Sequence, residues 1–281
     1  MTILDCTVGY GGHAESILAS SDPCTKLIGL DRDSRAIDFC RRRLVGFGER
    51  AVLLTGNYRD LKHHLTAAGV SVVDGVLFDF GISSPQLDDP ARGFSFQHDG
   101  PLDMRMDQAG GMTAAQLVNS SQEDRLADII FQYGEERYSR RIARAIVRER
   151  ARHPIETTRA LASIIAKSVP STYRNGRIHC ATRTFQALRI AVNHELETLE
   201  PSLRDAVDVL SPGGRICAIS FHSLEDRIVK HTFRTFARGA DAKLSLLARK
   251  PVLPSKEERR VNPRARSAKL RVAERLQYRM V

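Results

Sequence analysis

Strand-like and helix-like segments alternate at the beginning of this chain, and this pattern constrains the fold more than any other sequence feature. Short apolar runs are separated by longer amphipathic segments. The runs that we expect to form strands are Thr2–Asp5, Leu27–Leu30, Ala51–Thr55 and Val72–Phe80. Because a helix between two strands returns the chain to the same end of the sheet, such alternation favours a parallel sheet. The sequence therefore predicts an α/β fold.

The alternation is interrupted after the fourth expected strand, and the next clear strand-like run is Arg215–Phe221. The segment between them is far longer than a crossover helix requires. Helix-like stretches fill it, namely Ser121–Gln132, Glu135–Arg152, Thr157–Lys167 and Thr182–Leu199. We therefore expect an inserted helical domain, residues 104–181, within a sheet domain made of residues 1–103 and 182–281. Pro201 should open a further helix, because proline suits a first turn but not a helix interior.

A glycine-rich turn follows the first expected strand. Asp5, Gly9, Gly11 and Gly12 form the pattern Asp-x3-Gly-x-Gly-Gly directly before a helix-like segment. Glycines here let the backbone approach a ligand closely, at the strand ends where open α/β sheets bind nucleotides. Asp31 ends the next expected strand, roughly twenty residues on, where a carboxylate can accept ribose hydroxyls. A merely structural turn is the alternative, but the position of Asp31 favours a nucleotide-type cofactor.

Two cofactors fit this turn. The stretch Gly9–Ala14 also matches the dinucleotide fingerprint, so an NAD-type oxidoreductase is one alternative. The end of the fourth expected strand favours S-adenosylmethionine instead, because Asp79 there leads into Ser83–Pro85. A short acid-led, proline-containing loop at this place is typical of amino-directed methyltransferases. It positions an exocyclic amine in line with the reactive methyl, which makes Asp79, Ser83 and Ser84 candidate catalytic residues.

The chain is strongly basic, with 43 lysines and arginines against 33 aspartates and glutamates and a net charge of +10. A polyanionic partner would account for this excess, because each neutralised phosphate releases counterions. Charge that only keeps the protein in solution is the alternative. Four arginines at helical spacing favour RNA contact, namely Arg137, Arg141, Arg144 and Arg148. A second basic patch follows at Arg259, Arg260, Arg264, Arg266, Lys269 and Arg271. A non-catalytic RNA-binding or assembly factor is therefore a third hypothesis.

Other sites and locations are disfavoured by what the sequence lacks. The five cysteines are scattered without a CxxC pair, which indicates reduced thiols, and no histidine or cysteine cluster predicts a metal site. No apolar run approaches the ~20 residues of a membrane-spanning helix, and the first residues contain no apolar signal segment. By elimination we expect a cytosolic or organelle-matrix protein, with the cytoplasm as our prediction, and no membrane partner.

Longer motifs run along nearly the whole chain. They are DFGISSPQLDD from Asp79, RGFSF from Arg92, DGPLDMRMD from Asp99, YGEER from Tyr133, RIARAI from Arg141, ATRTFQALRI from Ala181, SFHSLEDRIVK from Ser220 and NPRARS from Asn262. In content and order they resemble the ribosomal small-subunit RNA methyltransferase H family (MraW type). That family usually has phenylalanine where Tyr58 stands. It also carries a His-x-Pro-Val-Leu-Leu segment before the first strand. The sequence here begins almost at that strand.

The resemblance implies a Rossmann-like class I methyltransferase sheet with an inserted all-helical domain. It implies S-adenosylmethionine as cofactor and methylation of the exocyclic N4 amine of a cytidine near the decoding centre of 16S-type rRNA. The partner would be small-subunit rRNA or the 30S subunit, and a homodimer is left open. The family's cofactor contacts carry over to Gly11, Gly12, His13, Asp31, Tyr58, Asp79 and Gln86.

Contacts with the substrate base are also expected. The ring of Phe94 or Phe96 is a candidate to stack on the base, with packing inside the loop as the alternative. Asp103 and Arg105 are candidate cytidine contacts. His222 either faces the active cleft or is a structural histidine.

Overall fold

The computed structural model describes residues 1–277 and divides into two compact units. Unit 1 consists of Met1–Gly81 together with the chain from Leu196 onward, and unit 2 is Ile82–Glu195. Helices formed by residues 1–277 include none with the length and apolar character needed to cross a bilayer.

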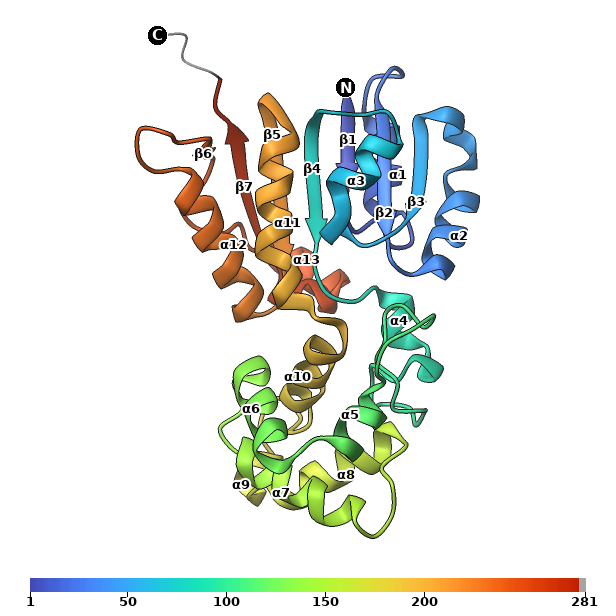
Figure 1. Ribbon diagram of the computed structural model, residues 1–281, viewed down its shortest axis with the longest axis vertical. Coiled ribbons are helices and arrows are strands. Elements are labelled where there is room, and N and C mark those ends of the chain that lie inside the picture. Colours follow the sequence, from blue (N-terminus) through green and yellow to red (C-terminus); the bar gives the residue numbers. More distant parts are fainter. Residues whose placement is uncertain (278–281) are drawn as a thin grey trace. The chain divides into compact units, whose positions relative to one another are not determined.

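Unit 1 contains a seven-stranded mixed sheet within the described residues (Figure 1). The strands are β1 Thr2–Asp5, β2 Lys26–Asp31, β3 Ala51–Thr55, β4 Val73–Asp79, β5 Leu210–Ser220, β6 Leu244–Leu246 and β7 Lys269–Arg275. Their order is β3-β2-β1-β4-β5-β7-β6. Strands β1 to β5 pair in parallel, and β7 pairs antiparallel with β5 and β6. The order reverses between β1 and β4, and open α/β sheets bind ligands beyond the carboxyl ends of the strands at such a reversal. The expected α/β fold is confirmed.

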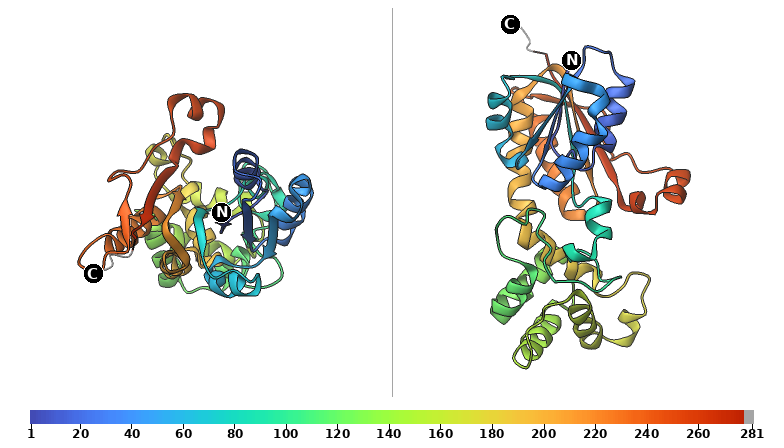
Figure 2. Two further views of the ribbon diagram at one scale, coloured as in Figure 1. Left: turned by 90° about the horizontal axis from the view of Figure 1, so that it is seen from above. Right: turned by 90° about the vertical axis from the view of Figure 1, so that its right-hand side faces the viewer.

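Helices cover both faces of this sheet (Figure 2). One face carries α1 (Gly12–Ser20) and α2 (Ser34–Arg43), whose apolar side chains pack in one cluster with β2. The other face carries α3 (Leu61–Ala67), α11 (Glu195–Val209) and α12 (Ser223–Phe236), which share the larger cluster with β4 and β5. The remaining elements of unit 1 are α13 Lys256–Val261 and the 3-10 helices Val45–Arg50, Tyr58–Asp60 and Pro263–Ser267. Both faces are therefore buried, as a parallel sheet requires.

Unit 2 is helical. Its elements are α4 Ser84–Asp88, the 3-10 helix Pro90–Arg92, α5 Ala114–Ser120, α6 Glu123–Gly134, α7 Ser139–Arg150, α8 Thr158–Ser168, α9 Ser171–Arg174 and α10 Thr182–Asn193. They enclose an apolar cluster that includes Leu126, Ile146 and Leu161, each fully buried. Every member of this cluster comes from unit 2, so the unit has a core of its own.

The unit boundaries differ from the expected domain boundaries at residues 103/104 and 181/182. Phe94 and Leu102 lie in the apolar cluster of unit 2, and so do Phe185 and Leu188 of α10. Because apolar side chains are stabilised where they exclude water together, residues 82–103 and 182–195 belong to the helical unit.

The expected helix Thr182–Leu199 is also interrupted. Helix α10 ends at Asn193, His194 has a left-handed φ of 52°, and α11 begins at the next residue. Pro201 therefore lies inside α11 and does not open a helix. Leu199 and Leu203 on either side of it are almost completely buried in the core of unit 1. This packing maintains the helix across a residue that cannot donate a backbone hydrogen bond.

Candidate active site

Three carboxylates end neighbouring strands of unit 1 at the point where the strand order reverses. Asp5 ends β1, Asp31 ends β2 and Asp79 ends β4. The Asp31 carboxylate is held by the backbone: Gly9 N donates to Oδ2 at 2.9 Å, and Asp33 N donates to Oδ1 at 2.8 Å. These bonds orient the Asp31 side chain at the strand end, beside the glycine turn, where the sequence predicts ribose binding.

Burial raises the pKa values of these carboxyl groups. Asp5 is 1% exposed, and burial raises its pKa to about 7, with the charges of Asp79 and Asp31 acting in the same direction. Burial also raises the pKa of Asp31. It raises the pKa of Asp79 to about 6, although the nearby charge of His13 opposes the shift. Burial thus disfavours the charged form of all three groups, and a cationic ligand at this edge would favour it.

Asp79 is linked to both ends of the glycine turn. Its backbone N–H donates to Thr7 Oγ1 at 2.7 Å, and its Oδ2 lies 3.6 Å from Nδ1 of His13. The side chain is 28% exposed. Among the described residues, neither Oδ1 of Asp79 nor Oδ2 of Asp5 has a hydrogen-bond partner. The carboxylate of Asp79 therefore keeps acceptor capacity for a ligand.

The two neighbouring glycines of the turn serve different purposes. Gly11 has a left-handed φ of 80°, and a Cβ on it would lie only 2.8 Å from Cys40 Sγ. Gly12, the first residue of α1, has no atom within 4 Å of the place its Cβ would take. No side chain caps the first N–H groups of α1, which leaves them for a ligand acceptor. Gly11 is thus required by the fold, whereas Gly12 borders open space.

Tyr58 follows β3 and is half-buried. Its ring lies edge-on to Phe78 and Phe80, with centroids 5.8 and 6.2 Å away. Thr198 of α11 donates to its hydroxyl at 3.5 Å. The hydroxyl that distinguishes this residue from the usual phenylalanine therefore has a partner on α11. A contact between the ring and the cofactor stays a prediction.

Three further candidates lie on the loop that opens unit 2. Ser83 and Gln86 form a capping box at α4: Ser83 N donates to Gln86 Oε1 at 3.1 Å, and Gln86 N donates to Ser83 Oγ at 3.4 Å. Gln86 is 6% exposed, and Ser84 is exposed. The side chains of Ser83 and Gln86 shape the loop. Contacts of Ser83, Ser84 and Gln86 with cofactor or substrate stay predictions.

The expected base-stacking rings are engaged within unit 2. Phe94 is 6% exposed in the core. The Phe96 ring lies 4.6 Å from His179 and 4.8 Å from Phe185, measured between centroids. These are the contacts of the loop-packing alternative, and stacking on a base stays a prediction.

Asp103 and Arg105 bind each other. The Arg105 guanidinium donates to both carboxylate oxygens of Asp103, at 2.7 and 3.0 Å. In unit 1, His222 caps α12 and accepts from Glu225 N at 3.3 Å. Its side chain is 9% exposed. In these contacts Asp103, Arg105 and His222 have structural roles. Their contacts with the cytidine stay predictions.

Arg137 differs from the other arginines of the expected stripe. Helix α7 begins at Ser139, so Arg137 precedes it. Its guanidinium lies 4.8 Å from the ring centroid of Tyr138 and 5.0 Å from that of Tyr173. Arg137 is therefore held by cation–π contacts.

The three other arginines of the stripe lie on α7 and are exposed. Arg144 pairs with Glu123 and Arg148 with Glu149, each at 3.3 Å. Exposed pairs of this kind contribute little stability and open easily, so these arginines remain available to phosphates. RNA binding by the stripe stays a prediction.

Sequence reasoning left Asp5 out of the site and treated it only as the start of the glycine motif. Its position after an apolar run, the same as that of Asp31 and Asp79, is the signal that could have added it. In the second basic patch, Lys269 and Arg271 share the carboxylate of Asp226, and RNA binding by this patch stays a prediction.

Comparison with known proteins decides between the cofactors that fit this edge. The MraW methylase family matches residues 1–276. A relative from Synechococcus elongatus, named Ribosomal RNA small subunit methyltransferase H, is 53% identical over 273 residues, covering 97% of this chain and 88% of its own. A relative of the same name from Brevibacillus brevis is 46% identical over 286 residues, covering 97% and 91%. This chain belongs to the MraW methylase family.

As an MraW methylase, the chain is a methyltransferase with S-adenosylmethionine as its cofactor. A sulfonium cation suits an edge at which three neighbouring strands end in carboxylates. The NAD-type alternative and the non-catalytic alternative are therefore set aside.

The similarity of this chain to solved structures is weaker than its similarity to these relatives. An rRNA methylase from Streptococcus thermophilus has a TM-score of 0.43 and 12% identity, covering 98% of this chain and 87% of that one. Fibrillarin from Aeropyrum pernix, in complex with S-adenosyl-L-methionine, has a TM-score of 0.42 and 11% identity, covering 97% and 65%.

Proposed function

We propose that this MraW methylase transfers the methyl group of S-adenosylmethionine to the exocyclic N4 amine of a cytidine in small-subunit ribosomal RNA, near the decoding centre. Its relatives carry the proposal: over 97% of this chain they are 46–53% identical and are named for methylation of small-subunit rRNA. The substrate is rRNA itself or the 30S subunit, and the reaction takes place in the cytoplasm. The acid-led loop that begins at Asp79 supports an amine as the methyl acceptor.

The chemistry requires help from the protein because cytosine N4 is a weak nucleophile, its lone pair being delocalised into the ring. S-adenosylmethionine, when bound, supplies an electrophilic methyl on a sulfonium centre. The protein must hold the amine in line and stabilise the positive charge that develops on nitrogen. Asp31, oriented by two backbone N–H groups, would hold the ribose of the cofactor.

We infer that Asp79 acts on the amine. Its partly exposed carboxylate ends β4 and can accept a hydrogen bond from the N4 amine. A pKa of about 6 leaves the carboxylate charged at neutral pH, yet basic enough to hold the proton that the amine loses.

The test is incubation of the purified chain with methyl-labelled S-adenosylmethionine and 30S subunits, followed by nucleoside mass spectrometry. We expect the label in N4-methylcytidine. Label in any other nucleoside would contradict the assignment of cytidine N4, and no transfer to RNA would contradict the function. Asp38→Asn, an exposed acid-to-amide change on α2, is a control that should retain wild-type transfer.

A further inference from the structure

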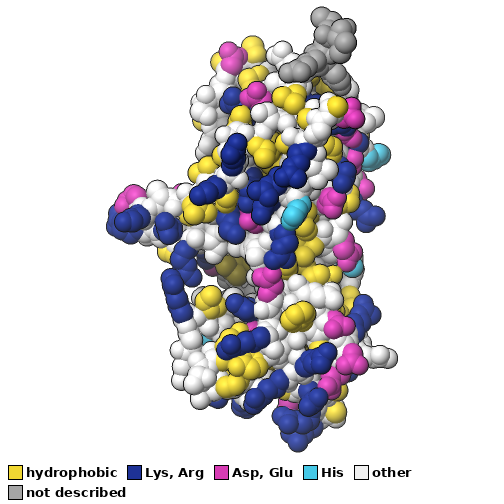
Figure 3. Space-filling view, turned by 90° about the vertical axis from the view of Figure 1, so that its left-hand side faces the viewer, with side chains coloured by type: hydrophobic (Ala, Val, Ile, Leu, Met, Phe, Trp, Pro, Cys, Tyr) yellow, Lys and Arg dark blue, Asp and Glu magenta, His cyan; other side chains and the backbone are white. Residues whose placement is uncertain are grey.

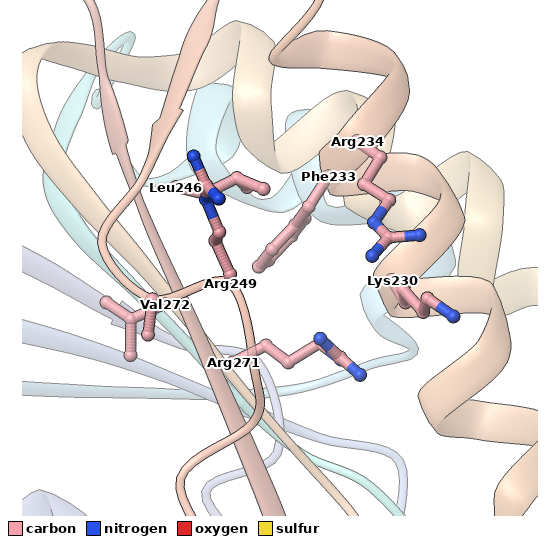
Figure 4. A pocket seen from close by; sticks show the side chains of 8 residues that line it. Lys230, Phe233, Arg234, Leu246, Arg249, Arg271 and Val272 are labelled. Atoms are coloured by element: carbon pink, nitrogen blue, oxygen red, sulfur yellow. The ribbon is translucent and has the colours of Figure 1, made fainter.

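A basic hollow lies between α12 and β7 in unit 1 (Figure 4). We call it the α12–β7 hollow, and its lining is Lys230, Phe233, Arg234, Leu246, Ala248, Arg249, Arg271 and Val272. Lys230 and Arg234 extend from α12, and Arg271 extends toward them from β7. Four of these eight residues are cations and none is acidic. An anionic ligand is therefore the kind that this lining favours.

The carboxylate of Asp226, which pairs with the lining residue Arg271, has two cationic partners. Arg271 Nε donates to Asp226 Oδ1 at 2.7 Å, and Lys269 Nζ donates to Asp226 Oδ2 at 3.3 Å. One acid thus serves two cations. Within residues 1–277, Lys230 and Arg234 take part in no ion pair. The charge of these two side chains is therefore not neutralised by the protein.

Lys230 and Arg234 lie close together, and among the described residues neither forms an ion pair that would stabilise the fold. Lys230 and Arg234 are one helical turn apart on α12, where like charges repel each other. Lysines and arginines also gather over unit 1 in the space-filling view of this side of the molecule (Figure 3). The exposed segment after the hollow adds further cations at Lys250, Lys256, Arg259 and Arg266. Such an unneutralised surface attracts polyanions and raises their local concentration.

We propose that the α12–β7 hollow binds backbone phosphates of the RNA substrate. The proposal rests on the proposed function, because it takes RNA as the substrate. Phe233 is only 2% exposed, so the hollow offers positive charge and no exposed ring on which a base could stack. Its contacts would therefore hold the RNA in place without reading its sequence. The hollow is also separate from the carboxylate edge, since β5 lies between β4 and β7 in the sheet.

The test compares two double variants that each remove two positive charges from unit 1. Lys230→Gln with Arg234→Gln alters the hollow, whereas Arg41→Gln with Arg42→Gln alters exposed residues of α2. The probe is a transcript of small-subunit rRNA, and its Kd is measured over a range of salt concentrations. We expect the slope of log Kd against log salt to fall by about 2 in the hollow variant, about 1 for each phosphate that is no longer neutralised. The α2 variant should keep the wild-type slope.

Each outcome decides the proposal. Equal slopes in the two variants would overturn it, because the charges would then act only through the net field. Displacement of the RNA from the wild type by inorganic phosphate at equal phosphate concentration would assign the hollow to small anions and overturn it as well. Wild-type protein that neither binds nor methylates the RNA would overturn the proposed function too. Methylation with an unchanged slope in the hollow variant would overturn this inference alone.

Folding is checked separately. The hollow variant should bind S-adenosylmethionine and melt like the wild type, because its substitutions lie away from the carboxylate edge. If the double variant melts early, Lys230→Gln alone provides the measurement. Its slope should then fall by about 1, and an unchanged slope would overturn the proposal.

Discussion

The three strand-end carboxylates differ because their neighbours differ. Both oxygens of Asp31 accept backbone N–H groups, so its side chain is oriented before any ligand binds. Asp5 is almost completely buried, and its pKa of about 7 means that its charge is only partly expressed at neutral pH. Asp79 is partly exposed beside His13. Of the three, Asp79 is therefore the one suited to exchange hydrogen bonds with a substrate.

Alanine substitutions at the two adjacent glycines should separate folding from cofactor binding. Gly11→Ala would force a side chain into a left-handed φ and against Cys40, and we expect it to lower the free energy of unfolding by about 1–3 kcal/mol. Gly12→Ala meets no protein atom, so it should change stability by less than ~0.5 kcal/mol while weakening S-adenosylmethionine binding. Thermal melting and calorimetry test this pair, and equal destabilisation by both changes would contradict it.

The raised pKa of Asp79 predicts how activity depends on pH. The carboxylate must be ionised to accept from the amine, and burial raises its pKa from 3.8 to about 6. Wild-type kcat/KM should therefore be constant above this pKa and fall about tenfold per pH unit below it. Asp79→Asn should lower kcat/KM and abolish this acidic limb of the pH profile. A limb that persists in Asp79→Asn would assign the titration to Asp5 instead.

At the scale of elements, α11 shows packing that outweighs local propensity. Its buried leucines lie on both sides of Pro201, so the helix continues where the chain alone would break it. The first four expected strands, in contrast, match β1 to β4 within one or two residues, because apolar runs bounded by turn residues are a local signal. The fifth was placed too late, since β5 begins at Leu210 and not at Arg215. The three-residue strand β6 and the short helix α5 were not predicted, since neither is long enough to show a period.

Pro201→Ala should therefore stabilise the protein. It restores a backbone donor inside α11, and this gain should exceed the added entropy of the unfolded chain, for a net increase of about 1–2 kcal/mol in the free energy of unfolding. Urea denaturation measures the change. Pro263→Ala, in the first turn of a 3-10 helix, is the control and should not stabilise. A loss of stability in Pro201→Ala would show that α11 accommodates the proline without cost.

At the scale of the whole molecule, the chain forms two units with separate apolar clusters, because a helical segment interrupts the sequence of the sheet. The core of unit 2 draws only on residues of that unit. The interruption was visible in the sequence as a long segment without strands. Its limits were not, because Phe94 and Phe185 are apolar residues that could pack in either unit, and only contacts between distant residues assign them.

Unit 2 should fold by itself. We expect a chain of residues 82–195 to unfold cooperatively in urea, with helical circular dichroism, because its buried apolar side chains find all their partners within the unit. The full-length chain, measured alongside, is the reference for helix content. A gradual, non-cooperative transition would show that the unit needs the sheet for its stability.

Some features of this methylase follow from local chemistry that can be read directly along the chain. The alternation of strand-like and helix-like segments predicts the parallel strands. The turn residues that follow two of these strands predict that Asp31 and Asp79 lie at strand ends. Other features arise only when distant segments meet. The packing of Gly11 on Cys40, the burial that raises the pKa of Asp5, and the unneutralised cations beside Asp226 all depend on residues far apart in the sequence. Burial and charge are properties of the three-dimensional neighbourhood, and periodicity along the chain does not encode which neighbours a residue will have.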